Sequence, residues 1–429
     1  MIHLSQINLF KKKLLSNPHI FFVTLTLVSG LINYAYYPVI SKILPVGEFG
    51  ISQGLIAILT QAGAAFSGIS ILTIYLSKII GQAQTRKIIY AIQKIIILLI
   101  IFLTFSLLLF QDFLTDYLKV GNQLNIPAVS IDLLLSIPFI VATSFLIANK
   151  KFIKAANLQL VVVIVKIFFG AILAQYLGSL GAILGIGVSY LLGMIIFSLI
   201  CKYYGVQPWE HDLKSVFAFA RKSDIVLLTA QSKNIVSILT VGTLATIYPS
   251  IDILVARHGL DNFHAGLYSA ASTLSSLIYF ASVPILNILM TQLNRKDISK
   301  SLSYIKEKFI VIIALCSFSI LLFLFMPKKL LDIFGPSYAI ESNTLWLFAL
   351  NMSIVTIMVG LLQVMVLFKP ILSFIVSVFV LILVIIETNN HNTSSSTIIG
   401  SAITSYLVGL AVLIIVSFRD FIKFQKGKI

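Results

Sequence analysis

Charged residues and cysteines are scarce in this sequence of 429 residues. Only 11% of the residues are charged and 59% are hydrophobic, whereas about 25% of the residues in soluble domains are charged. So few polar side chains cannot cover the surface of a soluble particle. The two cysteines, Cys201 and Cys316, lie in or beside apolar stretches, which excludes a disulfide framework or a cysteine-rich zinc site.

Catalytic motifs are missing as well. The sequence has no His-Glu-x-x-His, no Walker loop and no Gly-x-Ser-x-Gly, the local signatures of zinc proteases, nucleotide hydrolases and serine hydrolases. Gly185-Ile-Gly187 lies inside an apolar stretch, where helix packing explains it better than phosphate binding does. We therefore expect no enzyme, no metal site and no cofactor.

Acidic residues are about half as frequent as basic ones, with 15 Asp and Glu against 31 Lys and Arg. Such an excess can indicate nucleic-acid binding. Here the basic residues lie in short connections between apolar stretches, which is the pattern of membrane proteins with positive cytoplasmic loops. The sequence therefore predicts a membrane protein without a nucleic-acid partner.

Twelve apolar stretches have the character of membrane-spanning helices, which need about 20 residues each. They are predicted at 19–41, 50–76, 88–110, 125–148, 156–176, 180–201, 235–256, 265–290, 308–326, 342–367, 371–386 and 397–417. Of the basic residues, 25 lie in the N-terminus, every second connection and the C-terminus, whereas 5 lie in the other connections. This alternation predicts an even number of helices, with both termini in the cytoplasm.

The two halves of the sequence match at an offset of 216 residues. Ser189-Tyr-Leu-Leu-Gly193 recurs as Ser405-Tyr-Leu-Val-Gly409, and Gly50 corresponds to Gly266. The match predicts a duplication with six helices in each half, related by a pseudo-twofold axis along the membrane normal. The predicted parts are an N-terminal lobe (1–201), a cytoplasmic linker with an amphipathic helix (202–234) and a C-terminal lobe (235–429).

Small residues follow one face of the last predicted helix in each half. A spacing of four residues keeps them in line and lets a neighbouring helix approach closely. These residues are Gly181, Gly185, Ser189 and Gly193 in the first half, and Thr397, Ser401, Ser405 and Gly409 in the second. Each stripe predicts a tightly packed pair of helices.

Three segments carry a resemblance to a known family. Leu44–Leu55 is similar to that family's Leu-x-x-x-x-[Phe/Tyr]-Gly turn after the first helix. Asp252 followed by Gly259–Ser272 is similar to its Asp…Gly-x-Tyr-x-x-Ala segment, and Leu330–Leu350 to its Leu-Phe-Gly-x-x-Tyr segment. On these segments and the helix layout, the chain resembles the polysaccharide-exporter branch of the multidrug/oligosaccharidyl-lipid/polysaccharide (MOP) superfamily. Within that branch it resembles the O-antigen (Wzx-type) flippases.

The resemblance implies an all-α integral membrane protein of about 12 transmembrane helices, with a MATE-like fold of two lobes around a lumen. It implies a flippase that works by alternating access and moves undecaprenyl-pyrophosphate-linked oligosaccharide, the O-antigen repeat unit of lipopolysaccharide. The expected direction is from the inner to the outer leaflet of the bacterial cytoplasmic (inner) membrane. Expected partners are this lipid-linked oligosaccharide, membrane lipids, and polymerase and chain-length proteins of the same pathway.

Lys166 lies near the centre of the stretch predicted at 156–176. A charge at membrane depth costs roughly 2.5–3.5 kcal/mol on insertion scales, and such residues usually have a function. One interpretation is a lumen cation that meets the pyrophosphate of the cargo. The other is a lysine that is buried against a carboxylate or carbonyl groups, or whose ammonium group reaches the membrane surface.

Two aspartates lie near the outer ends of predicted helices. Asp252 and Asp132 are candidate sites for coupling transport to protons or sodium ions. The alternative for Asp252 is an ion pair with Arg257, or a structural aspartate that fixes the end of its helix. Asp132 has the same pair of functional and structural interpretations.

Three more basic residues are candidate contacts for an anionic headgroup. Lys42 and Arg257 follow the first and seventh predicted helices, so they either line the outer mouth of the lumen or anchor the helices at the membrane surface. Lys78 ends the second predicted helix at its cytoplasmic end. There it is either a first contact for the pyrophosphate or one of the ordinary positive charges of a cytoplasmic loop.

Other functions predict other sequences. A multidrug or small-cation antiporter of the same superfamily would have an acidic lumen, whereas only Asp132 and Asp252 are acidic candidates here. A membrane polymerase or ligase of the polysaccharide pathway would have a large external loop, and the longest predicted external loops are 111–124 and 327–341. A non-catalytic scaffold is a third alternative.

Overall fold

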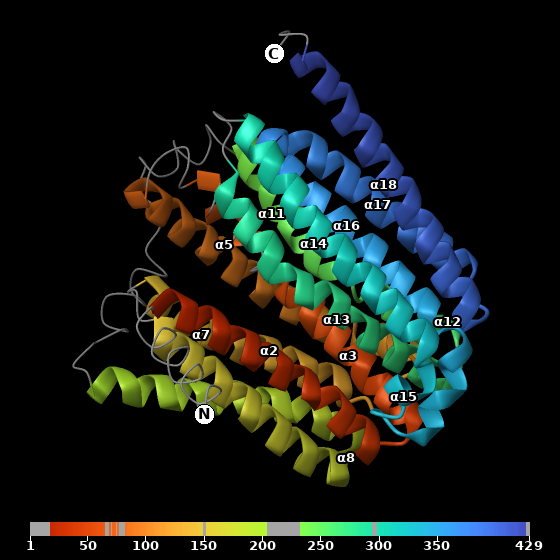
Figure 1. Ribbon diagram of the computed structural model, residues 1–429. Helices are drawn as coiled ribbons and strands as arrows, with labels where there is room; N and C mark the ends of the chain where they lie inside the picture. The colour runs from red at the N-terminus through yellow and green to blue at the C-terminus, as the bar shows by residue number, and fades with distance from the viewer. Residues whose placement is uncertain are drawn as a thin grey trace, which may run out of the picture. The chain divides into compact units, whose positions relative to one another are not determined.

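The computed structural model describes residues 18–64, 68–69, 71–73, 75–76, 82–148, 152–203, 232–293 and 298–425. Within these ranges the chain forms helices and turns without any strand (Figure 1). The helices of the first half are α2 (Pro18–Ile43), α3 (Val46–Gly63), α5 (Gln82–Leu109), α6 (Gln111–Tyr117), α7 (Asn125–Ala148) and α8 (Phe152–Tyr203).

The second half of the chain is also helical. Its helices are α11 (Ser232–Ile247), α12 (Ile251–Gly259), α13 (Asn262–Gln292), α14 (Ile298–Phe325), α15 (Pro327–Leu331), the 3₁₀ helix η1 (Pro336–Asn343), α16 (Leu345–Phe368), α17 (Pro370–Asn390) and α18 (Ser395–Gln425). Among the described residues, six helices are long and apolar enough to cross a membrane when α8 is counted once, or eight if each of two bent pairs also counts as one span. The predicted all-α membrane fold class is confirmed. The predicted linker lies almost wholly outside the described residues.

Helix α8 extends over 52 residues, but it is a hairpin rather than one span. At Gly178 the backbone leaves the helical region, with φ 63° and ψ −139°, and glycine adopts a positive φ without steric cost. A Cβ on Gly181 would lie 2.0 Å from the carbonyl oxygen of Leu173, and one on Gly185 would lie 2.3 Å from the Cα of Gly170. The two arms therefore pack on the predicted small-residue stripe, as two antiparallel helices.

The stretch predicted as one helix at 235–256 is broken. Helices α11 and α12 meet at an angle of 51°, and Pro249 lies in the turn between them, where it cannot donate a backbone hydrogen bond. The hydroxyl of Tyr248 donates to the carbonyl of Ser377 over 2.6 Å, and the hydroxyl of Tyr406 donates to the carbonyl of Tyr248 over 3.1 Å. Helices α17 and α18 thus hold the break in place.

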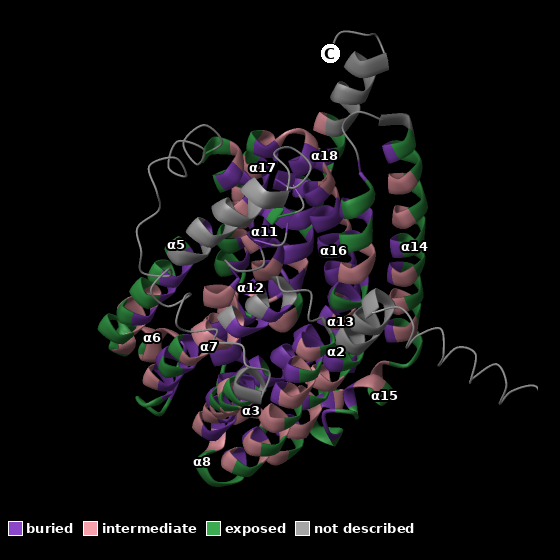
Figure 2. Cartoon of the chain, turned by 90° about the vertical axis from the view of Figure 1, so that its left-hand side faces the viewer, coloured by how far each residue is buried: buried purple, intermediate pink, exposed green. Residues whose placement is uncertain are grey.

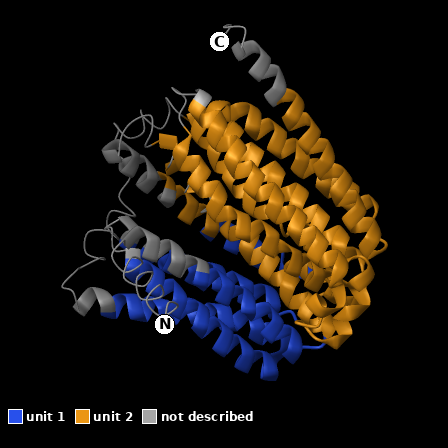
Figure 3. Ribbon diagram, viewed as in Figure 1, with its two compact units in different colours: residues 1–45, 101–112, 122–218 blue, residues 46–100, 113–121, 219–429 orange. Residues whose placement is uncertain are grey.

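The chain divides into two compact units, which Figure 3 shows in blue and orange. Unit 1 comprises residues 1–45, 101–112 and 122–218, and unit 2 comprises residues 46–100, 113–121 and 219–429. Unit 2 includes α3 because α3 packs along α13. These units differ from the two predicted lobes, and the division into lobes at 201 and 235 stays a prediction.

Unit 1 is built around α8. Helices α2 and α7 both pack along α8, and buried apolar residues form a cluster where α7 meets both arms of α8. This apolar core consists of Ala142, Leu146, Ala155, Leu158 and Phe197. On the far arm, a Cβ on Gly193 would lie 2.5 Å from Cγ2 of Val162. The glycine stripe therefore determines how closely the helices of unit 1 approach one another.

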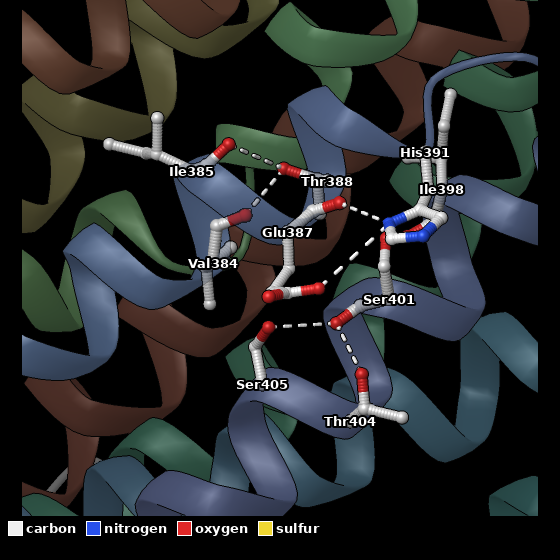
Figure 4. Close-up of polar contacts among 9 residues, drawn as sticks. All are labelled: Val384, Ile385, Glu387, Thr388, His391, Ile398, Ser401, Thr404 and Ser405. Atoms are coloured by element: carbon white, nitrogen blue, oxygen red, sulfur yellow. Dashed lines mark hydrogen bonds and ion pairs between the residues drawn. The ribbon is translucent and has the colours of Figure 1, made fainter.

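Unit 2 has α13 and α16 at its centre. In the apolar 18-residue segment of α16, 72% of the residues are buried, compared with 17% in that of α14. Figure 2 shows the buried residues in purple. The predicted stripe on α18 packs closely, because a Cβ on Gly409 would lie 2.4 Å from Cγ2 of Val380 on α17. The stripe hydroxyls of Ser401 and Ser405 donate to carbonyls of their own helix (Figure 4), so they need no partner on a neighbouring helix.

Candidate functional site

Lys166 lies in unit 1, about 18 Å along the first arm of α8 from the turn at Gly178. Its Nζ donates a hydrogen bond of 3.0 Å to Oδ1 of Asn33. The same atom lies 4.3 Å from the ring centroid of Tyr36 and 5.6 Å from that of Tyr37. None of the ion pairs between described residues includes Lys166. Within that part of the chain, the ammonium group meets an amide and two aromatic rings rather than a carboxylate.

The tyrosines of α2 form a packed wall beside Lys166. Tyr36 is fully buried, and its hydroxyl donates to the carbonyl of Ala182 over 2.6 Å. Tyr37 contacts both Tyr34 and Tyr36 edge to face, with ring centroids 5.6 Å and 5.8 Å apart. Tyr36 is therefore fixed in position and attracts the ammonium group through its ring. Its burial leaves no ring face for a sugar in this arrangement.

Asp132 of α7 is fully buried in the same unit. Neither of its carboxyl oxygens has a hydrogen-bond partner among the described residues. The second arm of α8 reaches it at Gly187, where a Cβ would lie 2.1 Å from Oδ1 of Asp132. This contact confirms that Gly185-Ile-Gly187 serves packing. A buried carboxyl group without donors is costly, so Asp132 stays a candidate for binding a proton or a cation.

Asp252 lies in the first turn of α12 in unit 2 and is 3% exposed. Its Oδ2 accepts hydrogen bonds of 2.9 Å from the hydroxyls of Tyr268 and Ser272 on α13. The start of a helix also favours a negative charge. Oδ1 has no partner among the described residues. Asp252 therefore links the start of α12 to α13, which fits the interpretation of a structural aspartate that fixes the end of its helix. Its Oδ1 could still accept a proton or bind a cation.

Arg257 is fully buried at the end of α12. Its Nε donates to the carbonyl of Leu118, and Nη2 donates to the carbonyl of Lys119, each over 2.8 Å. Nη2 also donates to Oδ1 of Asn262 over 2.7 Å. The structure does not pair Arg257 with Asp252, so that proposed ion pair is not formed. The guanidinium group instead holds the loop before α7.

The other candidate cations are less informative. Lys42, at the end of α2 in unit 1, is exposed. Lys78 lies outside the described residues. No group of three or more His, Cys, Asp or Glu side chains suited to a metal ion occurs in the described ranges.

The three segments that carry the family resemblance meet in unit 2. Phe49 of α3 packs edge to face on Phe334 and Tyr338, with ring centroids 5.9 Å and 5.7 Å apart. Tyr268 packs on Phe348 at 4.9 Å. Burial raises the pKa of Tyr338, which keeps the phenol neutral in this aromatic cluster. The motif residues are therefore explained by packing between α3, α13 and the segment before α16.

Predicted external connections also come together in unit 2. A Cβ on Gly47 would lie 3.2 Å from Cβ of Asn262, and one on Gly259 would lie 2.5 Å from the carbonyl oxygen of Asn392. Arg257 also contacts Leu118 and Lys119, and Phe49 contacts Phe334 and Tyr338. Together these contacts place parts of the loops that follow the first, third, seventh, ninth and eleventh predicted helices on one side of unit 2. Every second loop was predicted to lie on the same side of the membrane, and these loops do lie on one side of unit 2. The assignment of this side to the outside of the membrane stays a prediction.

Comparison with solved structures decides the fold. The lipid II flippase MurJ in an inward closed conformation matches with a TM-score of 0.66 and 15% identity, over 95% of this chain and 90% of MurJ. MATE in complex with MaL6 matches with a TM-score of 0.60 and 13% identity, over 93% and 96% of the two chains. The chain has the fold of the MATE and MurJ transporters.

A third match agrees with this fold. An inward-facing multidrug resistance MATE transporter of the MOP superfamily has a TM-score of 0.59 and 12% identity, over 90% of this chain and 94% of its own. These matching structures are transporters or flippases rather than enzymes. No protein-family model matches the sequence, and no curated protein matches it. The comparisons therefore show the fold of the MATE and MurJ structures.

Sequence reasoning missed several residues of these sites. Asn33 is a polar residue in an apolar stretch, three and four residues before Tyr36 and Tyr37, so helical spacing puts all three on one face. That spacing was the signal for a site opposite Lys166. The carbonyls of Leu118 and Lys119 give no sequence signal, because every residue has a carbonyl.

Proposed function

We propose that this protein is a flippase for a lipid-linked oligosaccharide with a pyrophosphate headgroup, with the O-antigen repeat unit as cargo. The MOP transporter fold and the net charge of +16 support the proposal. The observation that carries it is Lys166, deep in an apolar helix and without a carboxylate partner among the described residues. A membrane protein retains such an unneutralised cation at a cost, which favours a functional role.

The chemistry of the cargo defines what the site has to supply. A pyrophosphate cannot cross hydrocarbon unaided, because its charges would lose their hydration. The ammonium group of Lys166 has three N–H donors, and one of them is used by Asn33. The other two donors and the positive charge suit phosphate oxygens. The lipid tail would stay in the bilayer while the headgroup passes through a polar lumen.

Asp252 and Asp132 are the proposed coupling residues for protons or sodium ions. Each has at least one carboxyl oxygen without a partner among the described residues. Asp252 has two hydroxyl donors on its other oxygen, whereas Asp132 has no such donors among the residues that the structure describes. The location that we propose is the bacterial cytoplasmic membrane, with both termini in the cytoplasm, as the loop charges favour.

Transport in sealed vesicles tests the proposed function. Purified protein is placed in liposomes with a fluorescent undecaprenyl-pyrophosphate oligosaccharide, and an impermeant quencher reports how much headgroup has changed leaflet. We expect translocation to be faster than in protein-free liposomes. Equal rates with and without the protein would contradict the proposal.

A multidrug or small-cation antiporter is the second candidate function. The specific observation in its favour is Asp132, a buried carboxyl group without hydrogen-bond donors in the described ranges, which suits a cation. The same liposomes loaded with a cationic dye distinguish the two functions. Dye efflux without headgroup translocation would favour the antiporter.

A further inference from the structure

The loop between α6 and α7 is fastened to the end of α12 by three side chains. Arg257 donates to the carbonyls of Leu118 and Lys119 over 2.8 Å. His258 stacks on Tyr117 with ring centroids 4.0 Å apart, and its Nδ1 lies 3.0 Å from the carbonyl oxygen of Tyr117. In the opposite direction, Nζ of Lys119 donates to the carbonyl of Leu260 over 3.0 Å. All these residues belong to unit 2.

The backbone of Lys119 indicates that this fastening is held under strain. Lys119 has a φ of 50° and is the one non-glycine residue with a positive φ in the described ranges, a region that side chains disfavour. Its carbonyl is one of those that Arg257 binds. Strained backbone persists where surrounding contacts impose it and is common at segments that switch. Loss of the Arg257 bond would therefore allow the loop to relax.

The guanidinium group of Arg257 is also incompletely satisfied. It is fully buried, and Nη1 has no hydrogen-bond partner in the described part of the chain. Its bonded partners are neutral carbonyl and amide oxygens, while Glu48 acts on its charge from a distance. A buried, partly bonded charge gains hydration when it is exposed. The fastened arrangement is thus stable without being permanent.

We propose that residues 113–121 form a strap that opens and refastens on the end of α12, with Arg257 as its main fastener. Residues 122–124 connect the strap to α7, the helix that carries Asp132. Opening would expose Arg257 and the carbonyls of the loop to water together. The proposal concerns the motion of the strap and does not depend on the identity of the cargo.

Thiol labelling of the purified full-length protein in detergent tests the motion. Leu118→Cys places a thiol in the strap, at a position where the native residue is 2% exposed, and the native Cys316, at 3%, is a control of similar burial. Cys201→Ser removes the other thiol. Each rate is divided by the rate of the same thiol in the denatured protein. We expect the thiol introduced at position 118 to react at least about tenfold faster than Cys316, because local opening exposes it. Equal slow rates would overturn the strap.

Variants of the fastener test its cause. In the Leu118→Cys background, we expect Arg257→Gln to raise the labelling rate of the introduced thiol at least about tenfold further. Lys329→Gln, which removes an exposed cation of α15, should leave the rate unchanged. Lys119→Ala and Lys119→Gly both lose the side-chain bond to the carbonyl of Leu260. Alanine keeps the strain of a positive φ, whereas glycine adopts that φ without strain, so the introduced thiol should be labelled faster in Lys119→Ala than in Lys119→Gly. Unchanged labelling in both Arg257→Gln and Lys119→Ala would overturn the role of the fasteners.

Discussion

Gly50 and Gly266 lie directly against each other in unit 2. A Cβ on Gly50 would be 2.8 Å from both Cα and N of Gly266, and a Cβ on Gly266 would be 2.0 Å from the carbonyl oxygen of Val46. These glycines are 216 residues apart, the offset that relates the two halves of the sequence. Corresponding helices of the two halves, α3 and α13, thus approach at corresponding residues.

The close approach of these helices predicts a cost for any side chain at Gly50. We expect Gly50→Ala to destabilise the protein by about 1–3 kcal/mol, because the added methyl group would meet backbone atoms of α13. Gly63→Ala is the matched control on the same helix, since nothing lies within 4 Å of its Cβ position. Thermal unfolding in detergent measures both. An equal unfolding temperature for the two variants would contradict the close contact.

The two buried aspartates should respond differently to substitution. Asp252→Ala leaves the hydroxyls of Tyr268 and Ser272 without their acceptor, which should cost about 1–3 kcal/mol for each unsatisfied group. Asp132→Asn removes a carboxyl group that has no donors in the described part of the chain, so we expect stability to be unchanged or higher. Unfolding temperatures in detergent test this contrast. A large loss of stability in Asp132→Asn would show that its carboxyl group is satisfied in the folded protein.

Asp261 gives a pH dependence that is local to the start of α13. Its Oδ1 accepts from the backbone N–H of His264 over 2.9 Å, and this bond, followed by the bond with the His264 side chain, lowers the pKa of Asp261. Because the folded pKa lies below the unfolded value of 3.8, the cap stabilises the protein above that pH and is lost as pH falls through the folded pKa.

Asp261→Asn tests this cap. Asparagine is also a good N-cap but does not titrate, so we expect the variant to lose the acid-dependent part of helix stability only. Amide hydrogen exchange at His264 between about pH 3 and about pH 6 reports the cap directly. The same pH dependence in the native protein and in Asp261→Asn would assign it to another group.

Helix positions were readable from the sequence, because apolar stretches of membrane length have few alternatives. The stretch predicted at 125–148 coincides with α7, and the stretches predicted at 156–176 and 180–201 correspond to the two arms of α8. The stretch at 235–256 was predicted as one helix, and the structure breaks it into α11 and α12 at Pro249, which cannot donate a backbone hydrogen bond. Helices α3 and α13 are about half the sequence length apart and were not predicted to belong to one compact unit, because a repeat offset identifies similar segments but not contacts.

The candidate site was predictable only in part. Lys166 was identified because a charge in an apolar stretch is unusual, whereas its partner Asn33 is 133 residues away in sequence. Arg257 was predicted either to line the outer mouth of a lumen or to anchor its helix at the membrane surface, and in the structure it binds the backbone carbonyls of Leu118 and Lys119. Backbone acceptors leave no trace in residue identity, so only the fold could reveal them.

Translocation by Lys166→Ala in the sealed-vesicle assay tests the central claim most directly. We expect the variant to insert at normal levels and to lose at least about tenfold in headgroup translocation, with Lys166→Arg retaining part of it because the charge remains. Lys329→Ala, which removes an exposed cation, is the control and should transport normally. Full translocation by Lys166→Ala would contradict the account and leave Lys166 as a structural residue of α8.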